Sequence, residues 1–392
     1  MKHPIHKATA LLMATMLTAG IITGCGNGQE TASGDDTADV SYQYGLEQII
    51  HPFWKSDVIY NETVLMIKDG DGLPSGRLLL PAKKIISVRD YSLKKEYVEG
   101  TDYTYKDGVL TLTEGAKAPY LTTEQLMGVG VPTTMPGMAS SKTSTGRILW
   151  GEASYLFEKQ LAVTYTYDQA DWQGETASYS AALLPKTMKK LNSGEELKLL
   201  IYGDSIATGC NSSGYLGVEP KTPAWPQLVE QGLEAKFDSA VTLLNSSAGG
   251  TMSQWGAENA ASLAAAQKPD LAVIAFGMND GTGNVNPKTY VANIQKIMEA
   301  IREKNPDCEF ILIAPMLANP DSDYAGVQRE YGPELKALQG EGAAVVDMGA
   351  FHEALLKTKH YSSMSGNNIN HPNDFLARGY AMNILSLMID YK

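Results

Sequence analysis

At the centre of the chain stands Lys198-Leu199-Leu200-Ile201-Tyr202-Gly203-Asp204-Ser205-Ile206, where an apolar run gives way to glycine and polar residues. An uninterrupted apolar run is typical of a strand that is buried on both faces of a sheet. Ligands of open α/β sheets bind at the carboxyl ends of such strands. Ser205 is therefore well placed for chemistry, although a Gly-Asp-Ser triplet alone is more often a turn.

The second half of the chain, residues 193–392, alternates apolar strands with helical segments. Strands are predicted at 199–202, 241–244, 271–276, 310–314 and 343–346, and helices at 224–235, 254–266, 287–304, 325–339 and 376–389. Consecutive strands start roughly 30 to 43 residues apart, which leaves room for a crossover helix each time. The pattern predicts an α/β domain with a parallel five-stranded sheet and helices on both faces.

The preceding segment, residues 42–192, has the rhythm of β-structure. Residues 161–167 alternate with a period of two, as in a half-buried strand, and residues 103–113 read as a hairpin around a Lys-Asp-Gly turn. Short strands separated by Gly/Asp turns predict a β-sandwich domain.

Residues 1–24 have the layout of a signal peptide. Lys2 and Lys7 give a short basic start, residues 8–23 carry no charge, and this run is too short for a stable spanning helix. The ending Ile22-Thr23-Gly24-Cys25 resembles a bacterial lipobox; the alternative is an ordinary secretory signal with a chance cysteine.

The lipobox resemblance implies that Cys25 is lipidated and becomes the mature N-terminus. Residues 25–41 are rich in Gly, Ser, Thr and acidic residues, which predicts a flexible tether. The chain is thus expected to be an extracytoplasmic lipoprotein, with a membrane as partner through the anchor on Cys25.

Composition excludes several other classes of protein. Charged residues make up 19% and hydrophobic residues 43%, which is globular, and the net charge of -12 argues against nucleic acid as a partner. Cys210 and Cys308 are too few for a disulfide framework and are interpreted as structural. The sequence has no paired cysteines, His-x-x-x-His pair or phosphate-binding loop, so neither a metal nor another cofactor is predicted.

Polar blocks follow three of the predicted strands, and a fourth block precedes the last helix. They are Gly203-Asp204-Ser205, Asn245-Ser246-Ser247-Ala248-Gly249-Gly250-Thr251, Gly277-Met278-Asn279-Asp280 and Asn368-Ile369-Asn370-His371-Pro372-Asn373. Ser205 and His371 pair a nucleophile with a base, because a serine hydroxyl is a weak nucleophile until a base takes its proton.

These four blocks resemble the SGNH (GDSL) hydrolases, over about Lys198 to the C-terminus. The resemblance implies a flavodoxin-like α/β/α fold, an acyl-enzyme formed on Ser205 and His371 as the base. It also implies three oxyanion donors, namely the backbone N–H groups of Ser205 and Gly250 and the side-chain amide of Asn279. Gly249 is a rival for Gly250, but the spacing from Asn245 favours Gly250.

One position departs from the family pattern. The family usually has an aspartate three residues before the histidine, and this chain has Asn368. A neutral amide orients an imidazole but does not stabilise its charge as a carboxylate does. We expect a Ser-His dyad in which Asn368 or a main-chain carbonyl orients His371, with Asp280 and Asp374 as less favoured candidates.

The layout of a β domain before the hydrolase domain resembles carbohydrate esterases. It implies an extracytoplasmic serine esterase that removes acetyl groups from carbohydrate esters, with Trp225 and Trp255 either stacking on sugar rings or belonging to the core. Two alternatives remain open. One is a lipase or acyltransferase that uses the same site, and the other is a non-catalytic glycan-binding lipoprotein, prompted by the missing aspartate.

Overall fold

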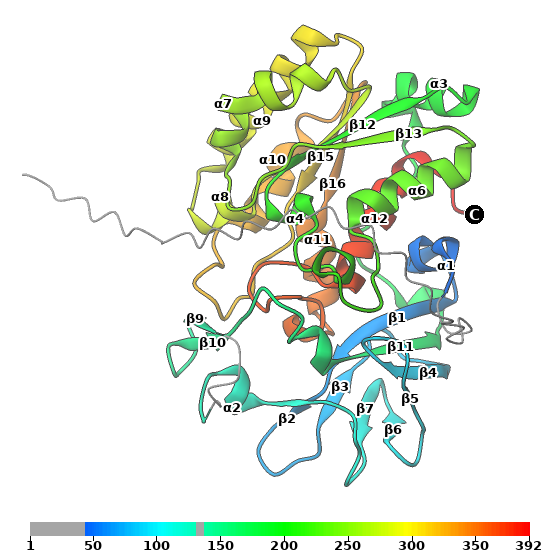
Figure 1. Cartoon of the computed structure of the whole chain (residues 1–392), viewed down its shortest axis with the longest axis vertical. Coiled ribbons are helices and arrows are strands. Elements are labelled where there is room, and N and C mark those ends of the chain that lie inside the picture. Colours follow the sequence, from blue (N-terminus) through cyan, green and yellow to red (C-terminus); the bar gives the residue numbers. More distant parts are fainter. Residues whose placement is uncertain (1–43, 131–136) are drawn as a thin grey trace, which may run out of the picture. The chain divides into compact units, whose positions relative to one another are not determined.

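The computed structural model describes residues 44–130 and 137–392 (Figure 1). The predicted signal peptide, Cys25 and the tether lie outside the described residues. Within those ranges, no helix is long and apolar enough to cross a membrane.

A parallel five-stranded sheet forms the centre of the second half of the chain. Its strands are β12 (Leu197–Gly203), β13 (Val241–Asn245), β14 (Leu271–Ala275), β15 (Glu309–Ala314) and β16 (Ala343–Asp347). The spatial order is β13-β12-β14-β15-β16, with every neighbouring pair parallel. This is the flavodoxin-like strand order. Successive strands are added on one side of β12 and then on the other, so the topological switch point lies between β12 and β14. The predicted fold class is confirmed.

Helices cover both faces of this sheet (Figure 1). They are α3 (Pro185–Ser193), α6 (Trp225–Phe237), α7 (Ser253–Leu263), α9 (Pro287–Lys304), α10 (Tyr331–Lys336), α11 (Met348–Leu356) and α12 (Asp374–Met388). Alternate residues of β12 enter two apolar clusters: Leu199 and Ile201 join the cluster of α6 and α12, and Leu200 and Tyr202 join that of α7 and α9. The continuous apolar run therefore reflects burial on both faces.

Several helices differ from the sequence prediction, among them α3 (Pro185–Ser193), which falls mostly in the segment predicted as β-structure. The helix expected at 325–339 is only α10, preceded by a 3-10 turn at Gln328–Glu330. Pro333 explains the late start, because proline lacks an N–H and is tolerated only in the first turn of a helix. The structure adds α11, whose N-cap Asp347 accepts a hydrogen bond from the Ala350 N–H at 2.9 Å.

Two larger sheets and a hairpin form the β region. One sheet has the order β1-β11-β4-β5, the other β6-β7-β3-β2-β8, and β9 pairs with β10. The bounds are β1 Val58–Leu65, β2 Ile67–Lys68, β3 Ser75–Arg77, β4 Lys84–Asp90, β5 Glu96–Tyr97, β6 Tyr103–Lys106, β7 Val109–Leu112, β8 Leu121–Thr122, β9 Met138–Ser140, β10 Arg147–Leu149 and β11 Gln160–Thr166. Val88 and Val163 of the first sheet and Leu110 of the second belong to the same apolar cluster.

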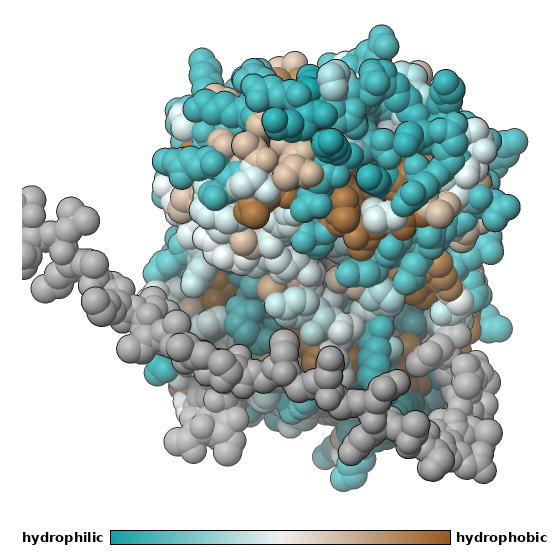
Figure 2. All heavy atoms as spheres, turned by 45° about the horizontal axis from the view of Figure 1, so that its top comes forward, coloured by the Kyte–Doolittle hydropathy of each residue, from teal (hydrophilic) through white to brown (hydrophobic). Residues whose placement is uncertain are grey.

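Shorter helical turns fill the connections. They are α1 (Leu46–Ile50), α2 (Thr123–Leu126), α4 (Ser205–Thr208), α5 (Ser213–Leu216) and α8 (Met278–Thr282), with 3-10 turns η2 (Phe53–Lys55), η3 (Phe157–Lys159), η4 (Gln169–Asp171), η5 (Ala181–Leu183), η6 (Ala265–Gln267), η7 (Gln328–Glu330) and η8 (Tyr361–Ser363). The upper part of the face in Figure 2 is largely hydrophilic, as expected where helices of the α/β region meet solvent.

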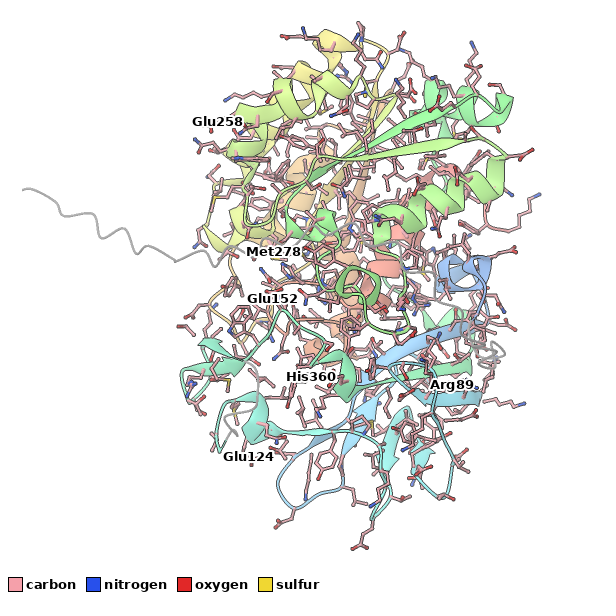
Figure 3. The ribbon with its side chains drawn as sticks, viewed as in Figure 1. Arg89, Glu124, Glu152, Glu258, Met278 and His360 are labelled. Atoms are coloured by element: carbon pink, nitrogen blue, oxygen red, sulfur yellow. The ribbon has the colours of Figure 1, made fainter. Side chains whose placement is uncertain are left out.

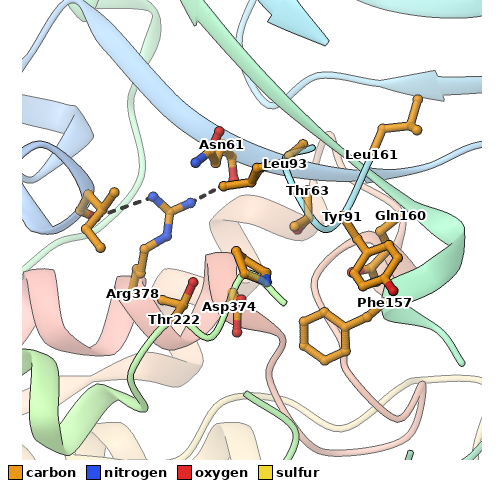
Figure 4. Close-up of a pocket in the computed structure, with 13 residues that line it drawn as sticks. Asn61, Thr63, Tyr91, Leu93, Phe157, Gln160, Leu161, Thr222, Asp374 and Arg378 are labelled. Carbon is orange, nitrogen blue, oxygen red and sulfur yellow. Dashed lines mark hydrogen bonds between the residues drawn. The ribbon is translucent and has the colours of Figure 1, made fainter. Parts of the chain in front are cut away.

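The β region is joined to the α/β region by buried polar contacts as well as a shared apolar core. Thr63 of β1 donates to the Ser363 carbonyl at 2.6 Å, and Gln160 of β11 donates to the Ser362 carbonyl at 2.7 Å. Arg378 of α12 donates across a small cavity of about 40 Å³ to the Asn61 carbonyl at 2.8 Å (Figure 4). These bonds satisfy polar groups that would otherwise be buried without partners.

A fully buried ion pair, Lys359 with Glu62, crosses the same junction. Burial lowers the pKa of Lys359, and the charge and hydrogen bond of Glu62 oppose that effect. Glu62 also accepts hydrogen bonds from the Leu79 N–H and the Tyr165 hydroxyl. These hydrogen bonds keep the Glu62 carboxylate buried in this position whether or not the lysine is present.

We predict that Lys359→Met lowers the free energy of unfolding by about 3 to 5 kcal/mol, because it leaves a buried carboxylate without its counter-charge. Urea titration followed by tryptophan fluorescence measures the change. Lys83→Met is the control, since Lys83 forms an exposed pair with Asp168 at 3.0 Å and its loss should leave the urea midpoint unchanged. Equal midpoints for the two variants would contradict the prediction.

Candidate active site

Ser205 lies two residues after the end of β12, an interior strand of the sheet. A Cβ atom at Gly203 would lie 2.2 Å from the Ala275 carbonyl oxygen of β14, so only glycine allows this close approach of the strands. Asp204 then caps α4, its carboxylate accepting the Ile206 N–H at 3.0 Å. The cap turns the chain so that Ser205 begins a helix at the carboxyl edge of the sheet.

His371 reaches Ser205 from the loop before α12. The distance from Ser205 Oγ to His371 Nε2 is 2.8 Å, and both residues are 7% exposed. The loop is fixed by Asn367, whose side-chain oxygen accepts the N–H groups of the residues at 369, 370 and 371, each at 3.0 Å. The side chain predicted as nucleophile and the one predicted as base are thus in hydrogen-bond contact.

Two acceptor oxygens face the other nitrogen of the His371 ring. Asn211 Oδ1 lies 2.6 Å from His371 Nδ1, and Glu152 Oε2 lies 3.1 Å from it. Both partners accept, so Nδ1 carries the proton and Nε2 of the neutral ring presents its lone pair to the Ser205 hydroxyl. This is the tautomer that a general base needs.

The loops after β13 and β14 approach the same serine. A Cβ atom at Gly249 would lie 3.8 Å from Ser205 Cβ, and Gly250 has a φ of +74°, a conformation that favours glycine. Asn279, in α8 after β14, donates to the Thr251 carbonyl at 2.9 Å. An amide has two N–H donors, so Asn279 keeps one for a ligand. The assignment of Gly250 and Asn279 as oxyanion donors stays a prediction.

Burial shifts the carboxyl groups around the serine. It raises the pKa of Asp204 to about 7, against hydrogen bonds from the Ile206 and Met278 N–H groups and the charge of His371. Burial also acts to raise the pKa of Glu152, but hydrogen bonds from His371 and Asn367 and the charge of His371 outweigh it, so the net shift is downward. Glu152 is therefore the carboxyl group that stays ionised beside the histidine.

Asn368 does not orient His371, and this part of the prediction is wrong. Its side chain donates to the Leu149 carbonyl at 2.8 Å and accepts from the Ser362 hydroxyl at 2.5 Å. The backbone at Asn368 has a φ of +68°, a left-handed conformation that asparagine tolerates, and it turns the side chain toward β10.

The other predicted candidates lie away from the ring. Asp374 accepts from the Ser213 N–H at 2.7 Å, and Asp280 accepts from the Ser253 N–H at 2.9 Å, so neither carboxylate contacts His371. Trp225 is fully buried, and its Nε1 donates to the Ile206 carbonyl at 2.8 Å.

Trp225 therefore belongs to the core, and its proposed role in stacking on sugars is wrong. Trp255 is half-buried with its ring 6.2 Å from that of Tyr202, and a role in substrate binding stays a prediction.

Sequence reasoning missed Glu152 and Asn211. Asn211 lies shortly after Ser205 and has a φ of +62°. The only sequence signal for it was an asparagine in a turn, a residue type that tolerates this left-handed conformation. Glu152 lies 219 positions before His371, in the β region, on the segment between β10 and η3 (Figure 3). No local pattern marks such a residue, because its place depends on how the β region docks.

Residues 44–130 and 137–392 contain no group of three or more His, Cys, Asp or Glu side chains arranged to hold a metal ion. Cys210 and Cys308 are free thiols.

A buried serine whose hydroxyl contacts a tautomer-fixed histidine at the edge of a flavodoxin-like sheet defines the class of serine hydrolases. The model of the GDSL-like Lipase/Acylhydrolase family matches residues 201–380. That part of the chain matches the family model, and the resemblance inferred from the four sequence blocks is confirmed.

Two curated relatives match part of the chain. An arylesterase of Vibrio mimicus is 30% identical over 106 residues, which is 27% of this chain and 49% of the relative. A thioesterase 1/protease 1/lysophospholipase L1 of Escherichia coli strain K12 is 28% identical over 109 residues, 28% of this chain and 47% of the relative. The chain thus spans about half the length of the curated relatives it matches.

Solved structures include more distant likenesses. A two-domain esterase described as active on acetylated mannans is 20% identical, with a TM-score of 0.44 over 54% of this chain and 53% of that one. A catalytic variant of an acetylxylan esterase from Geobacillus stearothermophilus is 21% identical, with a TM-score of 0.40 over 48% of this chain and 92% of that one.

We predict that a fluorophosphonate reacts covalently with Ser205 and that His371→Ala slows this labelling about 10²- to 10⁴-fold, because the hydroxyl then has no base. Intact-mass spectrometry measures the adduct. Ser205→Ala should remain unlabelled, and Ser262→Ala, which removes an exposed hydroxyl on α7, should label like the unaltered protein. Labelling of Ser205→Ala at the normal rate would contradict the assignment.

Proposed function

We propose that the chain is a serine ester hydrolase, and the contact that carries this proposal is the 2.8 Å hydrogen bond between Ser205 Oγ and His371 Nε2. The match to the GDSL-like family model supports the same reaction class. In the proposed reaction Ser205 Oγ attacks the ester carbonyl carbon while His371 Nε2 takes the hydroxyl proton. The tetrahedral intermediate then collapses, its C–O bond to the alcohol breaks, and His371 returns the proton to the departing alcohol.

The second half of the reaction releases the acyl group. Water attacks the acyl-enzyme with His371 again as base, the carboxylic acid leaves, and the proton returns to Ser205 Oγ. Both tetrahedral intermediates carry an oxyanion, for which Asn279 and the backbone at Gly250 and Ser205 are the proposed donors. A single donor of this kind contributes roughly 3 to 4 kcal/mol in other hydrolases.

The proposed substrate is an acetylated carbohydrate. One structural observation favours it: Tyr215 in α5 is an aromatic residue that is 56% exposed. The helix that carries Tyr215 starts just after Asn211, whose side-chain oxygen lies 2.6 Å from His371 Nδ1. The pKa of the Tyr215 hydroxyl is raised by Cys210, by partial burial and by the negative charge of Glu152. A flat aromatic face beside a nucleophile suits stacking against a sugar ring, with the hydroxyl left for hydrogen bonds.

The proposed location is extracytoplasmic, with the protein anchored to a membrane through lipid on Cys25. The basis is the signal-peptide layout of residues 1–24 and the lipobox-like ending before Cys25. Several acyl chains on one residue would hold the protein firmly, since a single chain binds only marginally.

We predict that the protein hydrolyses aryl acetates and acetylated oligosaccharides, and that Ser205→Ala lowers kcat by about 10⁶-fold. Tyr215→Ala should raise KM about tenfold for the oligosaccharide and leave the small aryl acetate unaffected, because only the larger substrate reaches a stacking platform. Steady-state kinetics on both substrates measure this split, and Tyr179→Ala is the control because Tyr179 is an exposed tyrosine in another part of the chain.

Three outcomes would redirect the proposal. Rates that rise with acyl chain length would favour a lipase or acyltransferase. Binding of glycans without hydrolysis of any ester would favour a non-catalytic glycan-binding protein. Equal effects of Tyr215→Ala on both substrates would remove the argument for carbohydrate while keeping the esterase.

We predict that Cys25 is the site of lipid attachment. Growth of a bacterial host with a clickable fatty acid should label the full-length protein and leave Cys25→Ser unlabelled, because that variant lacks the acceptor thiol. Cys210→Ser is the control and should label normally, since Cys210 lies far along the chain from the signal sequence. Persistent labelling of Cys25→Ser would contradict the anchor.

A further inference from the structure

We propose that Glu152, supplied by the β region, is the acidic member of a Ser205–His371–Glu152 triad, and that Asn211 shares the histidine with it as a second, neutral positioning residue. The inference rests on the proposed esterase function. It replaces the expected Ser-His dyad with a site to which both parts of the fold contribute. Both residues act through the histidine and are therefore positioning residues.

The geometry at Glu152 is that of a fixed acceptor. One carboxylate oxygen, Oε2, lies 3.1 Å from His371 Nδ1, and the other, Oε1, accepts from the Asn367 side chain at 3.1 Å. Although half of the Glu152 side chain is exposed, both oxygens are thus held. Asn367 also binds the backbone N–H of His371, so one amide positions the carboxylate and the ring together.

The segment that carries Glu152 is itself tied to the histidine loop. Asn368 donates to the Leu149 carbonyl at 2.8 Å, and the Gly151 N–H donates to the Asn367 carbonyl at 3.3 Å. Asn368 occupies the position where the resembling family usually has aspartate. Here its amide holds the end of β10, three residues before Glu152. The carboxylate beside the histidine therefore comes from Glu152, in another part of the chain.

The two acceptors at Nδ1 do different physical work. Asn211 is 1% exposed and its oxygen lies 2.6 Å from Nδ1, so it fixes the ring and its tautomer. A neutral amide does little for the positive charge that the ring acquires when it takes the serine proton. Glu152 brings the negative charge that stabilises the imidazolium, which is the role of the acid in a serine triad.

The charged and titratable neighbours are compatible with this assignment. Asp204 interacts electrostatically with His371 from the other side, but it is bonded to the Ile206 and Met278 N–H groups rather than to the ring. Tyr215 of α5 interacts electrostatically with Cys210 and, more weakly, with Glu152. Glu152 is the carboxylate in hydrogen-bond contact with the ring.

The test is Glu152→Gln, which keeps the shape of the side chain and removes its charge. We expect kcat for an aryl acetate to fall about 10- to 100-fold with KM unchanged. This loss is smaller than the roughly 10⁴-fold loss seen when a triad also has the wrong histidine tautomer, because Asn211 still fixes the tautomer of His371. The acid limb of the pH–rate profile should move to lower pH, since the protonated ring loses its stabilising charge. Asn211→Leu should lower kcat without moving that limb.

Glu158→Gln is the matched control, because it removes the same charge in η3 of the same segment, where Glu158 accepts from the Ser154 hydroxyl at 2.8 Å. It should keep the kcat and pH profile of the unaltered protein. Thermal unfolding of all variants separates loss of activity from loss of fold. A Glu152→Gln protein with unchanged kcat and an unmoved acid limb overturns the triad.

A measurement without turnover separates this inference from the proposed function. In Ser205→Ala protein, the proton on His371 Nδ1 should give a downfield NMR resonance that moves upfield on Glu152→Gln, because a charged acceptor deshields it more strongly. If the unaltered protein hydrolyses no ester but this shift is present, the esterase proposal fails and the Glu152–His371 contact stands. If hydrolysis is normal and the resonance is unmoved, the triad fails and the esterase stands.

Discussion

The side-chain amide of Asn367 is the contact on which the candidate site depends. Its oxygen collects three backbone N–H groups, including that of His371, and its nitrogen donates to Glu152. Loops at the edge of a sheet lack the backbone hydrogen bonds of a strand, so their buried backbone N–H and C=O groups need side-chain partners. A single buried amide supplies those partners here and sets the distance between the ring and the carboxylate.

Much of the α/β region follows from the sequence because its signals are local. Long apolar runs, such as the one that becomes β12, mark strands buried on both faces, and polar residues at their ends mark the edge where Ser205 lies. In the β region the strand at 161–167 and the hairpin at 103–113 were predicted and are present, whereas several other strands are too short for a period-two pattern. Pro333 shortened a helix whose apolar pattern extends further.

The predictions that failed at the site had been made from local sequence alone. Asn368 was assigned by its spacing from His371, but a left-handed φ of +68° sends its side chain to β10 instead of the ring. Trp225 was expected either to stack on sugars or to belong to the core, and its ring stacks on that of Tyr380 in the core. Glu152 was invisible because docking of two regions, and no local pattern, brings it to the histidine. Backbone geometry and tertiary contacts determine which of these side chains reach the site.

The contact between Glu152 and His371 joins positions 219 residues apart, and it lies on the surface along which the two regions share a core. In an unfolded chain the two groups have no reason to meet, because closing so long a loop costs conformational entropy that only the native packing repays. Neither region alone contains all the groups around the imidazole. A nascent or partly folded chain therefore carries the serine without all of the groups that surround the imidazole, and this set is complete only at the end of folding.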